Sequence, residues 1–348
     1  MRTQHKRSRI WAIAALMLAF TLIAAACSSD DPVETSTETT AATTDPSTTS
    51  AVDITGAEAE PVEDTEPVED DSTVGPSTTV RDSGLTVTVQ AAGDHTVHTV
   101  VSPEQAFANA THIVETDNAL VLFDTQFLLP NAADFRAYAD SLGKPIEAVF
   151  ITHAHPDHFL GSEAFADLTL YAIADVVDAI AANGDAEVEE KQADFGPELI
   201  APTFIIPEIV ELGTMEIDGV AFELETVVDA EAESQLVVRI PDAGAIVTGD
   251  IIYSGSHLIL AGPADTWIQA INGLAADSAD YPIVLPGHGN AADPTVYDTN
   301  IAWLTTANEL LGTAETGEEF KQGLIDAFPE LGMEAAIDFV LPIYFPEG

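Results

Sequence analysis

Three histidines and an aspartate stand close together in residues 152–158, whose sequence is THAHPDH. Side chains of an extended chain repeat every two residues, so His153 and His155 would point to the same side. A turn at the proline that follows would carry Asp157 and His158 toward a second point. Neutral imidazoles and carboxylates are good ligands for zinc, iron and manganese. The segment therefore predicts one loop that serves two neighbouring metal ions.

A chance cluster of histidines on a surface loop is the alternative. The chain is not generally rich in histidine, because six of its nine histidines lie outside this segment. Residues 148–151, with the sequence AVFI, form a continuous apolar run just before it and predict a buried strand. A polar loop directly after a buried strand is typical of active sites in α/β proteins. We therefore favour a metal centre.

Strand and helix patterns surround this loop. Alternating or apolar runs predict strands over residues 85–90, 96–101, 110–115, 119–123, 148–151, 220–227, 235–240, 244–248 and 283–285. Turn signals at residues 93–94 and 116–118 pair the first four as two hairpins. Amphipathic patterns predict helices over residues 131–142, 173–182, 264–276, 294–311 and 316–327, with a weaker pattern over 185–194. The irregular apolar segment 194–207 could form a lid over the site.

The segment HAHPDH matches the HxHxDH signature of the metallo-β-lactamase superfamily, and further motifs follow in that family's order. Asp124 stands in a strand ending that resembles the family's Asp-Thr turn near the site. Asp250, in Gly-Asp after a strand, resembles the metal-bridging aspartate, and His288, in Pro-Gly-His-Gly, resembles the last histidine ligand. The resemblance covers roughly residues 110–290. It implies an α/β (α+β) fold, the four-layer αββα sandwich with two sheets packed face to face between outer helices.

One ligand of the family pattern is missing. The family has a histidine shortly before the bridging aspartate, and this chain has no histidine between His158 and His257. Alignment of residues 235–240 with the family's next strand places Asp229 there, and Glu231 would take its place if the loop is shifted. Two histidines alone hold a metal ion poorly. We expect Asp229 to be the third ligand, against the alternative of a site that has lost one ligand.

The resemblance then implies two divalent metal ions, zinc by the family's pattern. The implied ligands are His153, His155 and Asp229 for one ion, Asp157, His158 and His288 for the other, and Asp250 for both. Three carboxylates would lower the pull of the ions on bound water. Two histidines and one carboxylate also suit iron or manganese, so the metal's identity stays open.

The implied activity is hydrolysis of a small-molecule ester, thioester, lactone, amide or phosphoester by a hydroxide held between the two ions. Asp157 would orient the hydroxide and handle its proton in addition to binding metal. The superfamily hosts many chemistries, including iron-dependent oxygenases. A second hypothesis is a non-catalytic lipoprotein that binds a metal or ligand at a degenerate site.

His257 could donate a hydrogen bond to the substrate from a loop above the site, or could make a structural bond, and we weigh the two equally. The serines stand in no Gly-x-Ser-x-Gly elbow, which argues against a serine hydrolase. The chain also has no Walker or Gly-x-Gly-x-x-Gly loop, so a nucleotide cofactor is unsupported.

The N-terminus is predicted to direct export. Four of the ten basic residues precede residue 10, and an apolar run over residues 10–26 ends in three alanines before Cys27, the single cysteine. This pattern is typical of a secretory signal peptide, and it resembles a bacterial lipobox, although Ala24 stands where leucine is usual. The resemblance implies that Cys27 becomes a lipidated N-terminus at the outer face of the cell membrane. An uncleaved membrane anchor is the alternative.

Residues 28–83 are rich in Thr, Ser, Pro, Asp and Glu and contain no aromatic residue. Such a segment cannot bury enough apolar surface to offset its ordering entropy. It is predicted to be a disordered acidic tether between the signal peptide, residues 1–27, and a metallo-β-lactamase-like domain over residues 84–348.

The chain carries 59 Asp and Glu against 10 Lys and Arg, a formal net charge of −49. Such an acidic surface would repel a phosphate backbone, which excludes nucleic acid as an expected partner. The hydrophobic content of 46% argues against a chain disordered throughout. Residues 84–348 hold 44 acids and five bases, so the domain is itself anionic. We expect a solvated acidic surface suited to a salty exterior, where charges are screened.

Overall fold

A computed structural model describes residues 75–346. The predicted signal peptide, the predicted lipidation site Cys27 and most of the predicted tether lie outside these residues. Across the described part of the chain, no helix combines the length and the apolar character needed to cross a bilayer.

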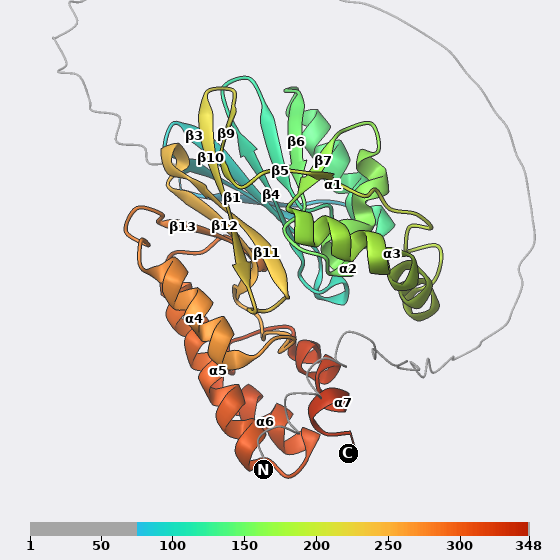
Figure 1. The fold of residues 1–348 in the computed structure, drawn as a ribbon, viewed down its shortest axis with the longest axis vertical. Coiled ribbons are helices and arrows are strands. Elements are labelled where there is room, and N and C mark those ends of the chain that lie inside the picture. Colours follow the sequence, from blue (N-terminus) through green and yellow to red (C-terminus); the bar gives the residue numbers. More distant parts are fainter. Residues whose placement is uncertain (1–74, 347–348) are drawn as a thin grey trace, which may run out of the picture. The chain divides into compact units, whose positions relative to one another are not determined.

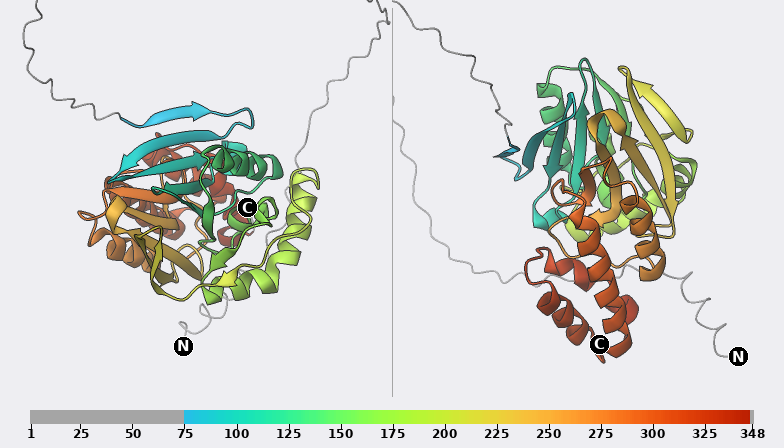
Figure 2. Two further views of the ribbon diagram at one scale, coloured as in Figure 1. Left: turned by 90° about the horizontal axis from the view of Figure 1, so that it is seen from above. Right: turned by 90° about the vertical axis from the view of Figure 1, so that its left-hand side faces the viewer.

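Two β-sheets form the centre of the described fold (Figure 1). The eight-stranded sheet follows chain order: β1 (Ser77–Val80), β2 (Thr86–Ala92), β3 (His95–Val101), β4 (Ala110–Glu115), β5 (Leu120–Phe123), β6 (Ile146–Phe150), β7 (Leu170–Ala172) and β8 (Glu208–Ile209). The five-stranded sheet has the order β13 (Ile283–His288), β12 (Ala245–Tyr253), β11 (Ser234–Ile240), β10 (Val220–Val228) and β9 (Gly213–Ile217). Figure 2 shows the blue and gold strands as two separate layers.

Helices lie outside the two sheets, and the C-terminal helices α6 (Gly317–Ala327) and α7 (Leu341–Tyr344) extend beyond one end of them (Figures 1 and 2). The other helices are α1 (Leu129–Ser141), α2 (Pro156–Phe159), α3 (Ala174–Phe195), α4 (Ala264–Ala275) and α5 (Thr295–Thr313). Short 3-10 turns lie at η2 (Glu104–Ala106), η3 (Leu160–Phe165), η4 (Pro241–Ala243) and η5 (Glu334–Phe339). Helices α4 and α5 pack against β12 of the second sheet. The described residues thus form the mixed two-sheet fold that the sequence predicts.

Two apolar cores hold these layers together. One joins the two sheets with helices α1 and α3 and includes Val149 and Phe222. The other lies between the second sheet and the C-terminal helices and includes Trp267 and Trp303. All nine residues of β12 are buried, as expected for a strand that is covered on both faces. Strand β12, which carries the Gly-Asp motif, is therefore a rigid support for the site.

Both predicted hairpins are confirmed, since β2 pairs antiparallel with β3 and β4 pairs antiparallel with β5. The two patterns at 173–182 and 185–194 form one helix, α3. Gly184 between them does not break the helix. A Cβ atom there would stand 2.3 Å from the ring of Phe204, so the glycine is needed where the chain packs closely.

Two expected boundaries are corrected. The predicted tether extends too far, because β1 lies within its range and pairs with β2, and Arg81 forms an ion pair with Asp134. The helix predicted over residues 294–311 runs further, because α5 continues to Thr313. The segment predicted as a lid contacts the fold: Phe204 packs on Phe159, and the backbone N–H of Ile205 donates to Ser162 Oγ.

Candidate metal centre

The histidine loop follows β6 and bends where the sequence predicts. His155 is extended and caps α2, whose first residue is Pro156. Proline suits the first position of a helix because its fixed φ is already helical. The helical turn then carries Asp157 and His158 away from the direction of His153. One loop therefore faces two points.

The structure brings the candidate ligands into two groups. Within each group, one ligand atom from every residue lies within 4.8 Å of the others. The first group is His153, His155, Glu231 and Asp250, and the second is Asp157, His158 and His288.

Asp250 lies between these groups. Its Oδ1 is 3.1 Å from His158 Nε2, and its Oδ2 is 3.0 Å from His288 Nε2 and 3.6 Å from His153 Nε2. A Cβ atom on Gly287 would stand 1.8 Å from Asp250 Oδ1, so only glycine fits there. The position between both groups is the one that a bridging carboxylate would need.

Glu231, and not Asp229, lies beside the first histidine pair. Asp229 is exposed at φ 53°, where its backbone N–H bonds to the carbonyl of Glu233. Glu231 is 3% exposed, with Oε1 3.3 Å from His155 Nδ1 and Oε2 3.8 Å from His153 Nε2. Strands β10 and β11 pair up to Val228 and Ser234, and the loop between them turns its middle inward. The expectation that Asp229 is the third ligand is therefore corrected: Glu231, the alternative for a shifted loop, lies at that place.

The three buried histidines each use Nδ1 in a bond away from the centre. His288 Nδ1 donates to the carbonyl of Phe107 over 2.7 Å, and His158 Nδ1 donates to Asp124 Oδ2 over 2.9 Å. His153 Nδ1 is 3.0 Å from Thr152 Oγ1, which accepts its proton because that hydroxyl donates to Asp124. When these imidazoles are neutral, each Nε2 presents a lone pair to the centre. Such outer bonds are typical of metal-binding histidines.

Asp124 is the common support of this arrangement. It sits at φ 63° after β5, a left-handed conformation that aspartate adopts more readily than most other residues. Its Oδ1 accepts the backbone N–H of Thr152 over 2.8 Å, and its Oδ2 accepts bonds from the side chains of Thr152 and His158. Asp124 thereby fixes both ends of the histidine loop, where the sequence predicts only an Asp-Thr turn near the site.

The donor atoms fit divalent cations. His153 Nε2 is buried without a hydrogen-bond partner, and such a group costs about 1–3 kcal/mol. Burial opposes protonation of His155, but the charges of Glu231 and Asp250 outweigh it and raise its pKa to about 9 in the ion-free chain. Burial would raise the pKa of Asp250, yet the surrounding histidines hold it well below the usual range. Two cations would take over the charge balance that protons supply here.

The centre opens on one side. The His155 side chain is 34% exposed and the Asp157 side chain 14%, whereas those of His153, His158 and His288 are fully buried. Solvent and a substrate can therefore reach the ligand atoms from the side of His155 and Asp157.

The sequence did not single out Asn109 or Tyr253. Asn109 is buried, with Nδ2 3.3 Å from His158 Nε2 and 3.5 Å from Asp157 Oδ2. Tyr253 donates its hydroxyl to Asp250 Oδ2 over 3.0 Å and stacks on the His288 ring at 4.5 Å. Burial, and then the nearby carboxylates, raise the pKa of this phenol well above its usual value.

A regular strand would have placed Tyr253 away from the centre, because residues three apart face opposite sides. The pairing of β12 with β13 is irregular between Gly249 and Tyr253, and this irregularity returns Tyr253 to the face of Asp250. Gly249, a glycine inside the strand at φ 52°, is the signal in the sequence that could have indicated this bulge.

His257 lies in the C-terminal core. It is fully buried, and its Nδ1 accepts a bond from Trp303 Nε1 over 3.0 Å. Burial lowers its pKa. The contact favours the structural alternative over a substrate-facing role.

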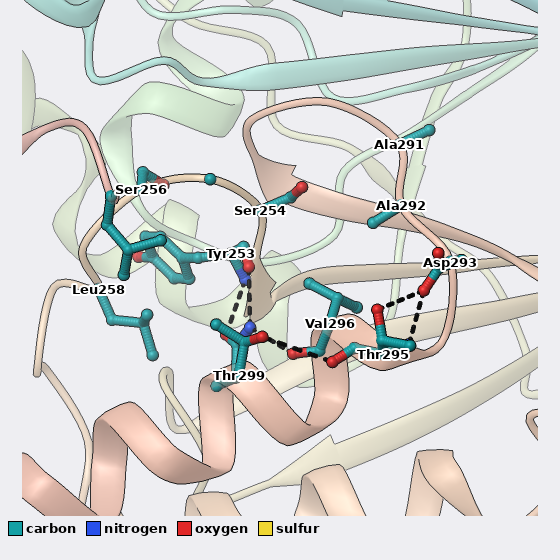
Figure 3. Close-up of a pocket in the computed structure, with 13 residues that line it drawn as sticks. Tyr253, Ser254, Ser256, Leu258, Ala291, Ala292, Asp293, Thr295, Val296 and Thr299 are labelled. Carbon is teal, nitrogen blue, oxygen red and sulfur yellow. Dashed lines mark hydrogen bonds between the residues drawn. The ribbon is translucent and has the colours of Figure 1, made fainter. Parts of the chain in front are cut away.

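A cavity of about 430 Å³ lies between the loop after β12 and the start of α5 (Figure 3). Tyr253 lines it, and the side chain of Asn300 bonds to both the N–H and the carbonyl of Tyr253. The other lining residues include Ser254, Ser256, Leu258, Asp293, Thr295, Val296 and Thr299.

Residues 105–288, more than half of the chain, match the sequence profile of the metallo-β-lactamase superfamily. The chain belongs to this superfamily. The DIM-1 metallo-β-lactamase, a solved member of the fold, superposes with a TM-score of 0.50 at 15% identity, covering 66% of this chain and 100% of that chain. That likeness shows the metallo-β-lactamase fold.

Two curated relatives are sulfatases. A linear primary-alkylsulfatase of Pseudomonas sp. (strain ATCC 19151) is 23% identical over 220 residues, which cover 51% of this chain and 40% of that protein. The alkyl/aryl-sulfatase BDS1 of Saccharomyces cerevisiae is 25% identical over 186 residues, which cover 43% of this chain and 28% of that protein. The chain thus spans less than half the length of either relative.

Proposed function

We propose that this chain is a metal-dependent hydrolase that cleaves an ester bond at a two-metal centre. The observation that carries the proposal is Asp250, which lies within 3.6 Å of histidines from both ligand groups. Membership of the superfamily supports hydrolysis as the reaction class. Sulfate esters come first among the substrates to test because both curated relatives are named sulfatases. Thioesters, lactones, amides and phosphoesters follow.

The bound cations would lower the pKa of water and polarise the ester oxygen. His153, His155 and Glu231 would hold one ion, and Asp157, His158 and His288 the other. Asp157 is the only carboxylate of the second group and its side chain is 14% exposed, so it can also accept the proton of the attacking water. Tyr253 donates a hydrogen bond to Asp250 and thereby fixes the carboxylate that both ions would share.

The test combines metal analysis with a substrate panel. We expect about two equivalents of zinc, iron or manganese by elemental analysis, and hydrolysis of at least one ester class that a chelator abolishes and added metal restores. Asp250→Ala should lose metal and activity together. Two bound metal equivalents without turnover of any class would contradict the hydrolase and favour the metal-binding lipoprotein.

An oxygen-dependent iron enzyme is a second candidate. The set His153, His155 and Glu231 offers two imidazoles and one carboxylate, which suits non-haem Fe(II). Oxygen consumption by the anaerobically iron-loaded protein, with no ester hydrolysis by the zinc-loaded form, would favour it.

We also propose that the protein is exported and anchored by lipid on Cys27 at the outer face of the membrane. The basic start, the apolar run and the small residues before Cys27 support this. Cys27→Ser should move the protein out of the membrane fraction, and mass spectrometry of the wild-type N-terminus should show the acyl groups.

A further inference from the structure

Four phenylalanines from four separate segments meet beside the metal centre. Phe107 contacts Phe127 at 5.5 Å, Phe195 at 6.0 Å and Phe339 at 5.2 Å between ring centroids, and Phe127 contacts Phe195 at 5.2 Å. We call this set the aromatic wall. It joins η2, the loop after β5, the end of α3 and η5.

The aromatic wall is continuous with the candidate ligands. The carbonyl of Phe107 accepts the bond from His288 Nδ1. Asn109, two residues later, lies 3.5 Å from Asp157, the carboxylate at the open side of the centre. Helix α3, which ends at Phe195, packs against α2, which carries Asp157. The wall therefore lies next to the part of the centre that His288 and Asp157 form.

The chain holds Phe107 in place at a conformational cost. Phe107 and Ala108 have φ values of 66° and 50°, a region that bulky residues rarely adopt. The carbonyl of Ala108 accepts the N–H of Gly289, which ties this strained pair to the His288 loop. Strain of this kind persists at functional sites because the surroundings enforce it.

Part of the wall faces solvent. Phe339 is 39% exposed and is the only exposed phenylalanine in residues 75–346, while Phe107 and Phe195 are half-buried. Covering apolar rings that are in contact with water by another apolar group lowers the free energy. Within residues 75–346, no apolar side chain covers the exposed part of Phe339.

We propose that the aromatic wall binds an alkyl or aryl group of the substrate and holds the adjoining ester at the metal centre. This inference rests on the proposed function for the position of the ester, while the apolar contact itself can be measured without turnover. Selectivity would then come from chain length or ring size on one side of the scissile bond.

Binding of n-alkanesulfonates tests the inference, because their C–S bond is not an ester and they stay intact. Calorimetric titration of the metal-loaded protein with the methyl to octyl members should show Kd falling about two- to fourfold for each added methylene. Phe339→Ala and Phe195→Ala should each flatten this dependence, and the double variant should remove most of it, with little change for methanesulfonate. Phe345→Ala is the matched control, since this half-buried phenylalanine of the same C-terminal region packs on Phe320 outside the wall.

A wild-type Kd that does not change with chain length would overturn the inference, as would an unchanged dependence in the double variant that remains folded by circular dichroism. Sedimentation identifies another occupant: if Phe339→Ala turns a dimer into a monomer and leaves the chain-length dependence intact, the wall is an interface between copies. Chain-length-dependent binding with no hydrolysis of alkyl sulfates or p-nitrophenyl esters would sink the proposed function and leave the apolar binding surface standing.

Discussion

Two acids of one loop, Glu231 and Asp229, have opposite environments. Glu231 is buried beside His155, and Gln235 Nε2 lies 3.4 Å from its Oε2. Asp229 is exposed. We expect Glu231→Gln to lose about one metal equivalent and at least tenfold in activity, because an amide is a weaker ligand than a carboxylate. Mutation of a residue that only hydrogen-bonds to a metal ligand already costs about tenfold or more in metal affinity or activity. Elemental analysis and ester turnover measure both.

Asp229→Asn is the control for this change and should leave metal content and turnover unchanged. Glu231→His should retain the metal, since it restores the family's histidine. Loss of metal in Asp229→Asn with retention in Glu231→Gln would reverse the assignment.

Tyr253 supplies a hydrogen bond to a buried carboxylate. Tyr253→Phe removes the hydroxyl and leaves the ring on His288, so Asp250 Oδ2 loses one donor. We expect the free energy of unfolding of the ion-free protein to fall by about 1–3 kcal/mol. Denaturant titration measures this, and Tyr344→Phe, whose hydroxyl has only a 3.5 Å contact with a carbonyl, is the matched comparison.

His112 makes stability depend on pH. Burial lowers its pKa to about 4, while its Nε2 donates to the carbonyl of Pro286 over 2.8 Å. The unfolded chain then binds more protons than the folded chain between about pH 6.5 and 4, so stability is lost as pH falls through this window. The contribution is about 3 kcal/mol.

His112→Gln keeps a possible donor to Pro286 and removes the titration. Denaturant unfolding at pH 7 and pH 4 should therefore show a smaller difference in the variant than in the wild type. An identical pH dependence in both proteins would contradict the role of His112.

At the scale of elements, β1 completes the edge of the first sheet although all four of its side chains are exposed. Its ladder with β2 and the Arg81–Asp134 ion pair hold it, not apolar burial. We expect a protein that begins at residue 84 to be less stable than one that begins at residue 75, and to aggregate sooner because the edge of β2 is then open. Unfolding midpoints and light scattering would show this, and equal behaviour of the two would contradict it.

The difference between strands held by apolar burial and strands held by backbone pairing explains which elements the sequence can predict. Apolar runs predict strands β5, β6 and β12, and the order of the metal motifs can be read directly from the sequence. Strand β1 was missed because backbone pairing leaves no mark in composition. Glu231 and Tyr253 depend on a loop conformation and a bulge, which are settled by strand pairing elsewhere in the sheet.

At the scale of the whole molecule, acidic side chains greatly outnumber basic ones. Each of the six Lys and Arg side chains in residues 75–346 takes part in an ion pair with an acid: Arg81, Arg136, Lys144, Lys191, Arg239 and Lys321. The excess acids repel one another, and salt screens this repulsion.

We therefore expect the thermal midpoint of the folded domain to rise by roughly 5 °C between 0.05 and 2 M NaCl, equivalent to about 2 kcal/mol. Differential scanning calorimetry at fixed pH and metal content measures it. Equal midpoints at both salt concentrations would contradict the expected adaptation to a salty exterior.

The pairing of these bases has a consequence for proteolysis. Trypsin cleaves only after Lys and Arg, and residues 28–80 contain neither. The six Lys and Arg side chains of the folded domain, after which trypsin could cleave, are at most 28% exposed. Their exposure runs from 10% for Lys191 to 28% for Arg81 and Lys144. Tryptic cleavage at residue 81 or beyond should therefore report local or global opening, so limited digestion can count folded molecules without a substrate or an antibody.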